Sequence, residues 1–184
     1  GRVASVGVSH AIHDIYTAFL PSLLPVFIER FALSKTLAGL LAVFIQAPSL
    51  LQPLIGHRAD RVNLRHAVIV APAVSAVTMT LLGIAPSYTA LALLLVTAGI
   101  SSAFMHAIGP VVAGRLSGER LGRGMGLWMV GGELGRTLGP LVIVGALSFI
   151  GLAQTPWLMV PGVLASLLLM ILLKELAATV PPRG

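Results

Sequence analysis

The sequence predicts an all-α membrane protein with six transmembrane helices, and composition, apolar runs and the placement of positive charge all support this. The chain has 184 residues, of which 57% are hydrophobic and 10% are charged, and its mean hydropathy is +0.97. An ordinary soluble domain carries about 25% charged residues, so these charges cannot cover a solvated surface. We therefore exclude a soluble enzyme, a nucleic-acid-binding domain and a disordered tail. The chain has no cysteine, which excludes disulfides and thiolate metal sites.

Long apolar runs separated by helix breakers define the predicted spans. A helix needs about 20 apolar residues to cross a bilayer, and only helices and closed barrels satisfy every backbone polar group in lipid. Barrel strands would alternate over about 10 residues, and these runs are longer and uniformly apolar. We expect one domain over residues 1–184, with six spans at about 3–28, 37–56, 67–85, 88–113, 124–150 and 156–173.

Positive charge is distributed unevenly between the segments that connect these spans. Nine Lys and Arg residues lie in the end segments and in the loops after the second and fourth spans, whereas the loops after the first, third and fifth spans hold two. Cytoplasmic loops carry the excess of Lys and Arg. We therefore expect a multi-pass protein of the inner (plasma) membrane with both termini in the cytoplasm.

Polar and charged side chains inside the spans indicate a functional site, because a charge costs roughly 2.5–3.5 kcal/mol on insertion and usually faces a cavity or a partner. Those of the first span share one helical face, and the second and fourth spans each have a polar face as well. Those of the first, fourth and fifth spans also lie at similar depth. We expect a shared cavity near the membrane centre that involves His10, His13, Asp14, Thr17, Gln46, Ser102, His106, Glu133 and Arg136.

Proton exchange is the chemistry that this set favours. Imidazole titrates near pH ~6.5, close to working pH, and a dehydrated cavity favours the protonated form of a carboxylate such as Asp14. Arg136 stays charged, so it either holds an anionic substrate or neutralises Asp14. An ion pair with Glu133, three residues earlier, is the simpler role for Arg136.

Two other interpretations of the polar set remain open. Interhelical hydrogen bonds can serve only to fix helix packing, although Ser, Thr or Asn would do this at lower insertion cost. His10, Asp14 and His106 could also provide three zinc ligands, but they form no distinctive metal motif. We expect no metal and no cofactor.

The segment 56–65 resembles the signature loop of the major facilitator superfamily, Gly-x-x-x-Asp-Arg-x-Gly-Arg-Arg/Lys. Gly56, Asp60, Arg61 and Arg65 match the pattern, and Asn63 stands where the second glycine is expected. In that family the loop connects neighbouring helices through charge pairs and helps to gate transport. The resemblance therefore implies that the matching residues act as a gate.

The fifth span is similar to the antiporter motif of the same superfamily. Gly126, Gly135, Gly139 and Pro140 match, whereas the closing Gly-Gly pair of the motif is absent. Independently of the family, Gly131, Gly135 and Gly139 form a seam of small residues that permits close helix approach.

The resemblance narrows to the fosmidomycin-resistance branch of drug exporters, through Ser9-His10 with Asp14, Phe104-Met105-His106, and the residues around Gly131 and Gly139. It covers the whole chain but only the first six of the usual twelve helices. It implies two inverted three-helix repeats and a C-terminal half absent from this sequence. That half would be fused to the chain or supplied by a dimer.

The sequence therefore predicts secondary active transport of a small molecule, by proton-coupled efflux. Uptake through the same architecture and a non-transporting membrane module are the alternatives. The expected partners are membrane lipid, the substrate, protons and the second six-helix half, with no nucleic acid. We expect no enzyme, since the sequence has no nucleophile motif, phosphate loop or metalloprotease helix.

Overall fold

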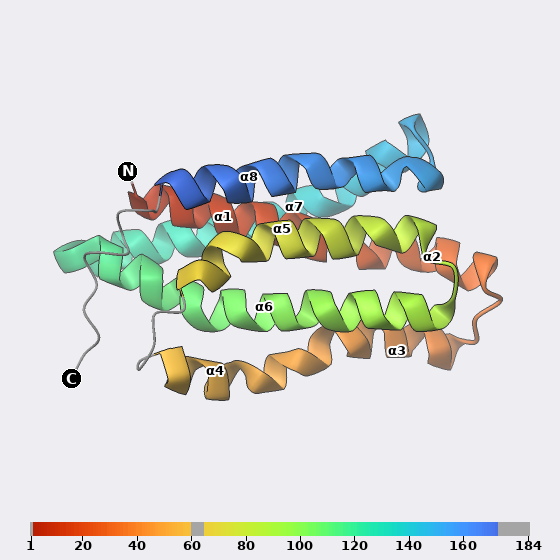
Figure 1. The fold of residues 1–184 in the computed structure, drawn as a ribbon, viewed down its shortest axis with the longest axis horizontal. Helices are drawn as coiled ribbons and strands as arrows, with labels where there is room; N and C mark the ends of the chain where they lie inside the picture. Colours follow the sequence, from red (N-terminus) through yellow and green to blue (C-terminus); the bar gives the residue numbers. More distant parts are fainter. Residues whose placement is uncertain (1, 60–64, 173–184) are drawn as a thin grey trace.

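The computed structural model describes residues 2–59 and 65–172, and every regular element in these residues is helical (Figure 1). The α-helices are α1 (Arg2–Thr17), α2 (Leu20–Arg30), α3 (Lys35–Gln46), α4 (Gln52–Ala59), α5 (Arg65–Leu81), α6 (Tyr88–Ser117), α7 (Leu121–Phe149) and α8 (Met159–Leu172). Four short 3-10 segments join them: η1 (Ala47–Leu51), η2 (Leu82–Ile84), η3 (Gly118–Arg120) and η4 (Leu152–Leu158).

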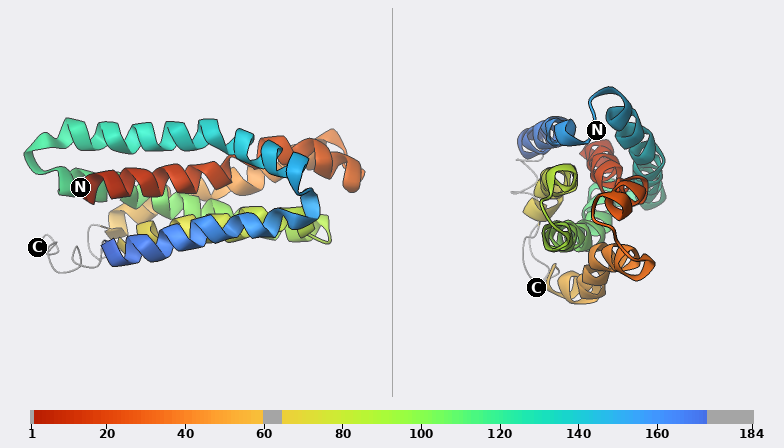
Figure 2. Two further views of the ribbon diagram at one scale, coloured as in Figure 1. Left: turned by 90° about the horizontal axis from the view of Figure 1, so that it is seen from above. Right: turned by 90° about the vertical axis from the view of Figure 1, so that its right-hand side faces the viewer.

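These elements form an elongated bundle of six rods that run up and down (Figures 1 and 2). The apolar segments Arg2–Arg30, Lys35–Arg58 and Leu152–Leu172 are each long enough to cross a membrane. Tyr88–Phe149 covers two further rods, α6 and α7, and Val68–Ile84 is a shorter apolar helix. The predicted all-α membrane fold is therefore confirmed.

Prolines explain where the rods bend. A proline lacks the N–H that would bond the carbonyl four residues earlier, and its ring crowds that carbonyl. α1 accordingly ends at Thr17, four residues before Pro21, and the chain resumes as α2 at Leu20. In the second rod, Pro48 lies within the 3-10 segment that separates α3 from α4.

The helix contacts follow the two-fold relation that inverted repeats require. α1, the first helix of the first repeat, packs along α7. The helix that corresponds to α1 in the second repeat is α6, and it packs along α3, η1 and α4 (Figure 2). α5 and α8, the third rods of the two repeats, pack against each other. This pattern agrees with the two inverted three-helix repeats that the resemblance implies.

Glycines bring the backbones of α1 and α7 into direct contact. A Cβ atom placed on Gly131 would collide with the carbonyl oxygen of Gly7, and one on Gly135 with that of Ala11. Gly139 faces the carbonyl of Ile15 in the same way. The small-residue seam of α7 is therefore the surface on which α1 rests, whereas Gly126 has no atom near the corresponding position.

A polar layer separates two apolar cores along the bundle. On α1, Val6 belongs to one core and Tyr16 to the other, and on α7, Trp128 and Ile143 are divided in the same way. His10, His13 and Asp14 lie between Val6 and Tyr16 and are buried. The ionisable groups are thus held at mid-height of the rods, with packed hydrocarbon on both sides.

Candidate functional site

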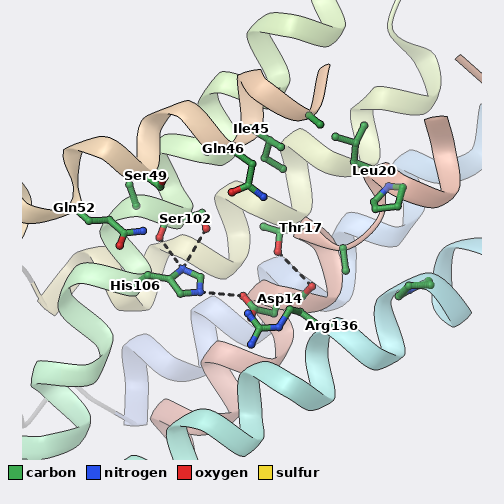
Figure 3. A pocket seen from close by; sticks show the side chains of 16 residues that line it. Asp14, Thr17, Leu20, Ile45, Gln46, Ser49, Gln52, Ser102, His106 and Arg136 are labelled. Atoms are coloured by element: carbon green, nitrogen blue, oxygen red, sulfur yellow. Dashed lines mark hydrogen bonds and ion pairs between the residues drawn. The ribbon is translucent and has the colours of Figure 1, made fainter. Parts of the chain in front are cut away.

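A cavity of about 520 Å³ lies between the first, second, fourth and fifth rods (Figure 3). Of the predicted site residues, Asp14, Thr17, Gln46, Ser102, His106 and Arg136 all line it, together with Pro140. Ser49 and Gln52 contribute further polar groups from η1 and α4. The wall is therefore polar on four of the six rods, as the polar faces in the sequence predicted for the first, second and fourth.

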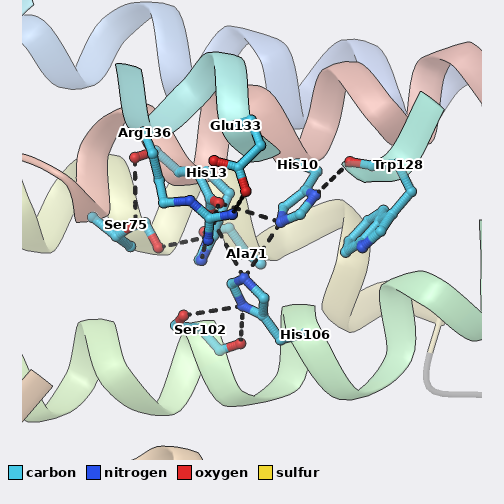
Figure 4. A network of polar contacts seen from close by, with 11 residues as sticks. His10, His13, Ala71, Ser75, Ser102, His106, Trp128, Glu133 and Arg136 are labelled. Carbon is cyan, nitrogen blue, oxygen red and sulfur yellow. Dashed lines mark hydrogen bonds and ion pairs between the residues drawn. The ribbon is translucent and has the colours of Figure 1, made fainter. Parts of the chain in front are cut away.

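Asp14 is the most buried charged group of this cavity, with its side chain 2% exposed. Three imidazoles and one guanidinium surround its carboxylate. Figure 4 shows these side chains, of His10, His13, His106 and Arg136, gathered in one network. The Nε2 atoms of His10, His13 and His106 lie 3.3, 4.0 and 3.8 Å from its oxygens. Nη1 of Arg136 lies 3.7 Å away. Five groups from α1, α6 and α7 are thus brought together.

Glu133 joins the cluster through Arg136, whose Nη2 donates to Glu133 Oε1. The two side chains are 69% and 52% exposed, so they lie at the outer edge of the cluster. The two carboxylates, Asp14 and Glu133, face one guanidinium. With neutral imidazoles, this group therefore carries one uncompensated negative charge.

Backbone carbonyls select the tautomers of two histidines. His10 Nδ1 lies 2.9 Å from the carbonyl oxygen of Trp128, and His106 Nδ1 lies 2.9 Å from that of Ser102. Since a carbonyl oxygen can only accept, each Nδ1 carries the hydrogen. The two Nε2 atoms then present lone pairs, and they face each other at 3.3 Å.

Trp128 is a site residue that the sequence analysis missed. Its indole stacks on the His10 imidazole with ring centroids 3.7 Å apart and planes 12° from parallel. Gly132 and Gly109 leave room for the two rings, because a Cβ on Gly132 would meet His10 and one on Gly109 would meet Trp128. In the sequence, these two glycines are the only sign that Trp128 packs against His10.

Ser75 on α5 is a second missed residue. Its Oγ lies 2.9 Å from His13 Nδ1, and His13 is completely buried. This contact ties α5, the third rod, to the polar layer. His13 therefore belongs to the buried support of Asp14, since it is not among the residues that line the cavity.

The predicted gate is only partly within the described residues. Asp60 and Arg61 lie outside them, Gly56 is in α4, and Arg65 begins α5. Of the antiporter-like residues, Gly135 and Gly139 contact α1, Pro140 lines the cavity, and Gly126 is exposed.

A bundle of membrane-length helices around a cavity with polar side chains defines a multi-pass membrane protein. Residues 6–184 match the Major Facilitator Superfamily. The chain therefore belongs to this family.

Two curated relatives match the chain over most of its length. It is 27% identical over 178 residues to the Fosmidomycin resistance protein of Escherichia coli (strain K12), covering 96% of this chain and 43% of the relative. It is 26% identical over 174 residues to the uncharacterized MFS-type transporter YfnC of Bacillus subtilis (strain 168), covering 94% and 42%. The chain thus spans less than half of each relative. No solved structure matches it significantly.

Proposed function

We propose that the chain is the N-terminal half of a secondary transporter that exports a small molecule from the cytoplasm in exchange for protons. Membership of the family supports transport of a small molecule across a membrane. The name of the Escherichia coli relative, a fosmidomycin resistance protein, supports drug efflux as the direction of transport. The single observation that carries the proposal is the buried carboxylate of Asp14, which lines the cavity and lies within 4.0 Å of three imidazole Nε2 atoms.

Proton exchange at Asp14 follows from the net charge of the cluster that Asp14 forms with the three histidines, Arg136 and Glu133. The cluster has one negative charge more than positive when the histidines are neutral, and burial makes an uncompensated charge expensive. A single proton on Asp14 or on a neighbouring imidazole removes the imbalance. A protonated and a deprotonated site then stabilise different conformations of the transporter, which is what coupling requires.

A second six-helix half is needed to cover the open side of the cavity. Glu133 and Arg136 lie near the middle of α7, and their side chains are more than half exposed. Charged side chains at that depth are rare against lipid and face protein or a water-filled space. We therefore infer that this face of α7 meets another half, either fused to the chain or provided by a second copy. The gate between the halves would include Gly56, Asp60, Arg61 and Arg65.

The test of this function is proton-driven transport by the whole protein reconstituted in vesicles. Asp14→Asn keeps the shape of the side chain and removes its titration, so we expect flux that no longer responds to a pH gradient. Glu29→Gln, which changes an exposed carboxylate at the end of α2, is the matched control and keeps the response. Unchanged coupling in Asp14→Asn would remove Asp14 from the mechanism.

The same vesicles distinguish the alternative functions. Substrate that accumulates together with protons would identify an uptake system of the same architecture. The absence of any flux in the intact protein, with normal folding, would identify a non-transporting membrane module. Export of substrate that is driven by protons moving in the opposite direction supports the proposal.

A further inference from the structure

We propose that His10, Asp14 and His106 form a binding site for a divalent transition-metal ion of the Zn²⁺ type beside the cavity, which Asp14 and His106 line. One ligand atom from each residue lies within 4.8 Å of the other two. His10 Nε2 is 3.3 Å from His106 Nε2 and 3.3 Å from Asp14 Oδ2, and His106 Nε2 is 3.8 Å from Asp14 Oδ1. Zinc bonds of about 2.0–2.2 Å at tetrahedral angles place neighbouring ligand atoms roughly 3.3–3.6 Å apart. The three residues are therefore close to a coordinating arrangement.

The hydrogen bonds around the two histidines point the right atoms inward. Each imidazole donates its Nδ1 hydrogen to a backbone carbonyl, that of Trp128 or of Ser102, which leaves the Nε2 lone pair toward the centre. Metal-bound histidines nearly always donate their second N–H in this way. A second shell for two ligands is thus already present.

When the imidazoles are neutral, no donor in the described part of the chain lies within hydrogen-bond distance of the Asp14 oxygens, and the Arg136 guanidinium stays 3.7 Å away. The buried oxygens of Asp14 have no hydrogen-bond partner among the described residues. Two imidazole lone pairs and a carboxylate that converge without a hydrogen between them repel one another, and a cation relieves that repulsion. Oxygen and imidazole nitrogen ligands in a tetrahedral set suit Zn²⁺ and Co²⁺.

Access from the cavity favours an ion, whereas the nearby guanidinium opposes it. The His106 side chain is 29% exposed and lines the cavity, so an ion can reach the site from there. Arg136 opposes binding, because its Nη1 is 3.7 Å from Asp14 Oδ2. Its guanidinium is half-exposed and also bonded to Glu133, so it can withdraw toward that partner.

Metal binding is measured on the whole protein in detergent, without transport, so this inference and the proposed function can fail separately. Zn²⁺ affinity is measured by calorimetry, and Co²⁺ coordination by its visible absorption. We expect His106→Ala and Asp14→Asn each to weaken Zn²⁺ binding by more than about tenfold. His57→Ala, which removes an exposed histidine of α4, is the matched control and leaves affinity unchanged.

Arg136→Gln provides the sharpest test. Removing the opposing charge should tighten Zn²⁺ binding several-fold, whereas a cluster that only fixes helix packing predicts no such gain. Thermal unfolding without metal shows that each variant is folded. If His106→Ala does not fold, the isosteric Asp14→Asn carries the test. Zn²⁺ affinity that is insensitive to both changes, or the lack of a tetrahedral Co²⁺ spectrum, would overturn the proposal.

Discussion

Ser9 compensates for a hydrogen bond that a proline removes on another helix. Pro72 lies within α5 and has no N–H for the carbonyl of Val68, four residues earlier. Ser9 Oγ on α1 donates to that carbonyl at 3.1 Å, and Ser9 is completely buried. One hydroxyl therefore satisfies an acceptor that would otherwise be orphaned between two helices.

This pairing predicts a specific coupling between two substitutions. Ser9→Ala should lower the free energy of unfolding by about 1 kcal/mol, because the Val68 carbonyl loses its donor. In a Pro72→Ala background the same change should cost much less, since the introduced alanine supplies the missing N–H. Thermal unfolding of the four proteins in detergent measures the cycle. Equal losses in both backgrounds would contradict the explanation.

At the scale of the element, the α1–α7 contact depends on glycines whose neighbours are backbone atoms. Backbone cannot rotate aside as a side chain can, so an added methyl group has to separate the helices. Gly131→Ala should therefore destabilise the protein by about 1–3 kcal/mol. Gly126→Ala lies on the same helix with no atom within 4 Å of the new group. We expect that control to leave the melting temperature unchanged or raise it, because alanine favours helix by about 1 kcal/mol. Equal destabilisation by both substitutions would rule out the seam as the cause.

Helical period accounts for what the sequence could predict about the site. His10, His13 and Asp14 recur on one face of the first span, so their burial toward a partner is readable without coordinates. Trp128 is different, because a tryptophan in an apolar helix has no periodic signal and its stacking on His10 depends on how α1 and α7 pack. Glu133 was expected to take part in the cavity, but the structure holds it at the outer edge beside Arg136.

At the scale of the whole molecule, the two ends of the bundle differ in charge. Arg2 at the start of α1, Arg58 near the end of α4, and Arg115, Arg120 and Arg123 around η3 lie at one end, whereas Arg30 and Lys35 lie at the opposite end (Figures 1 and 2). The excess of Lys and Arg on the first of these ends predicts that it faces the cytoplasm. Arg61, which also contributes to this excess, lies in residues 60–64, outside the described part of the chain.

Single cysteines can test this orientation, because the chain has none of its own. Thr89 and Glu119 are both exposed and lie near opposite ends of α6. We expect a membrane-impermeant maleimide added to intact cells to label Thr89→Cys and to label Glu119→Cys only after the cells are opened. The reverse pattern would show that the membrane orientation is inverted.

The glycine seam also limits how the bundle can move. Gly131, Gly135 and Gly139 each sit opposite a carbonyl of α1, and a slide of one residue along the axis, about 1.5 Å, would bring a bulkier neighbour to a place that admits only hydrogen. α1 and α7 are thereby locked in register and must travel as one rigid piece. The backbones that carry Asp14 and Arg136, one on each helix, are therefore held at a fixed spacing, and only a change of side-chain conformation can alter the distance between the two charges.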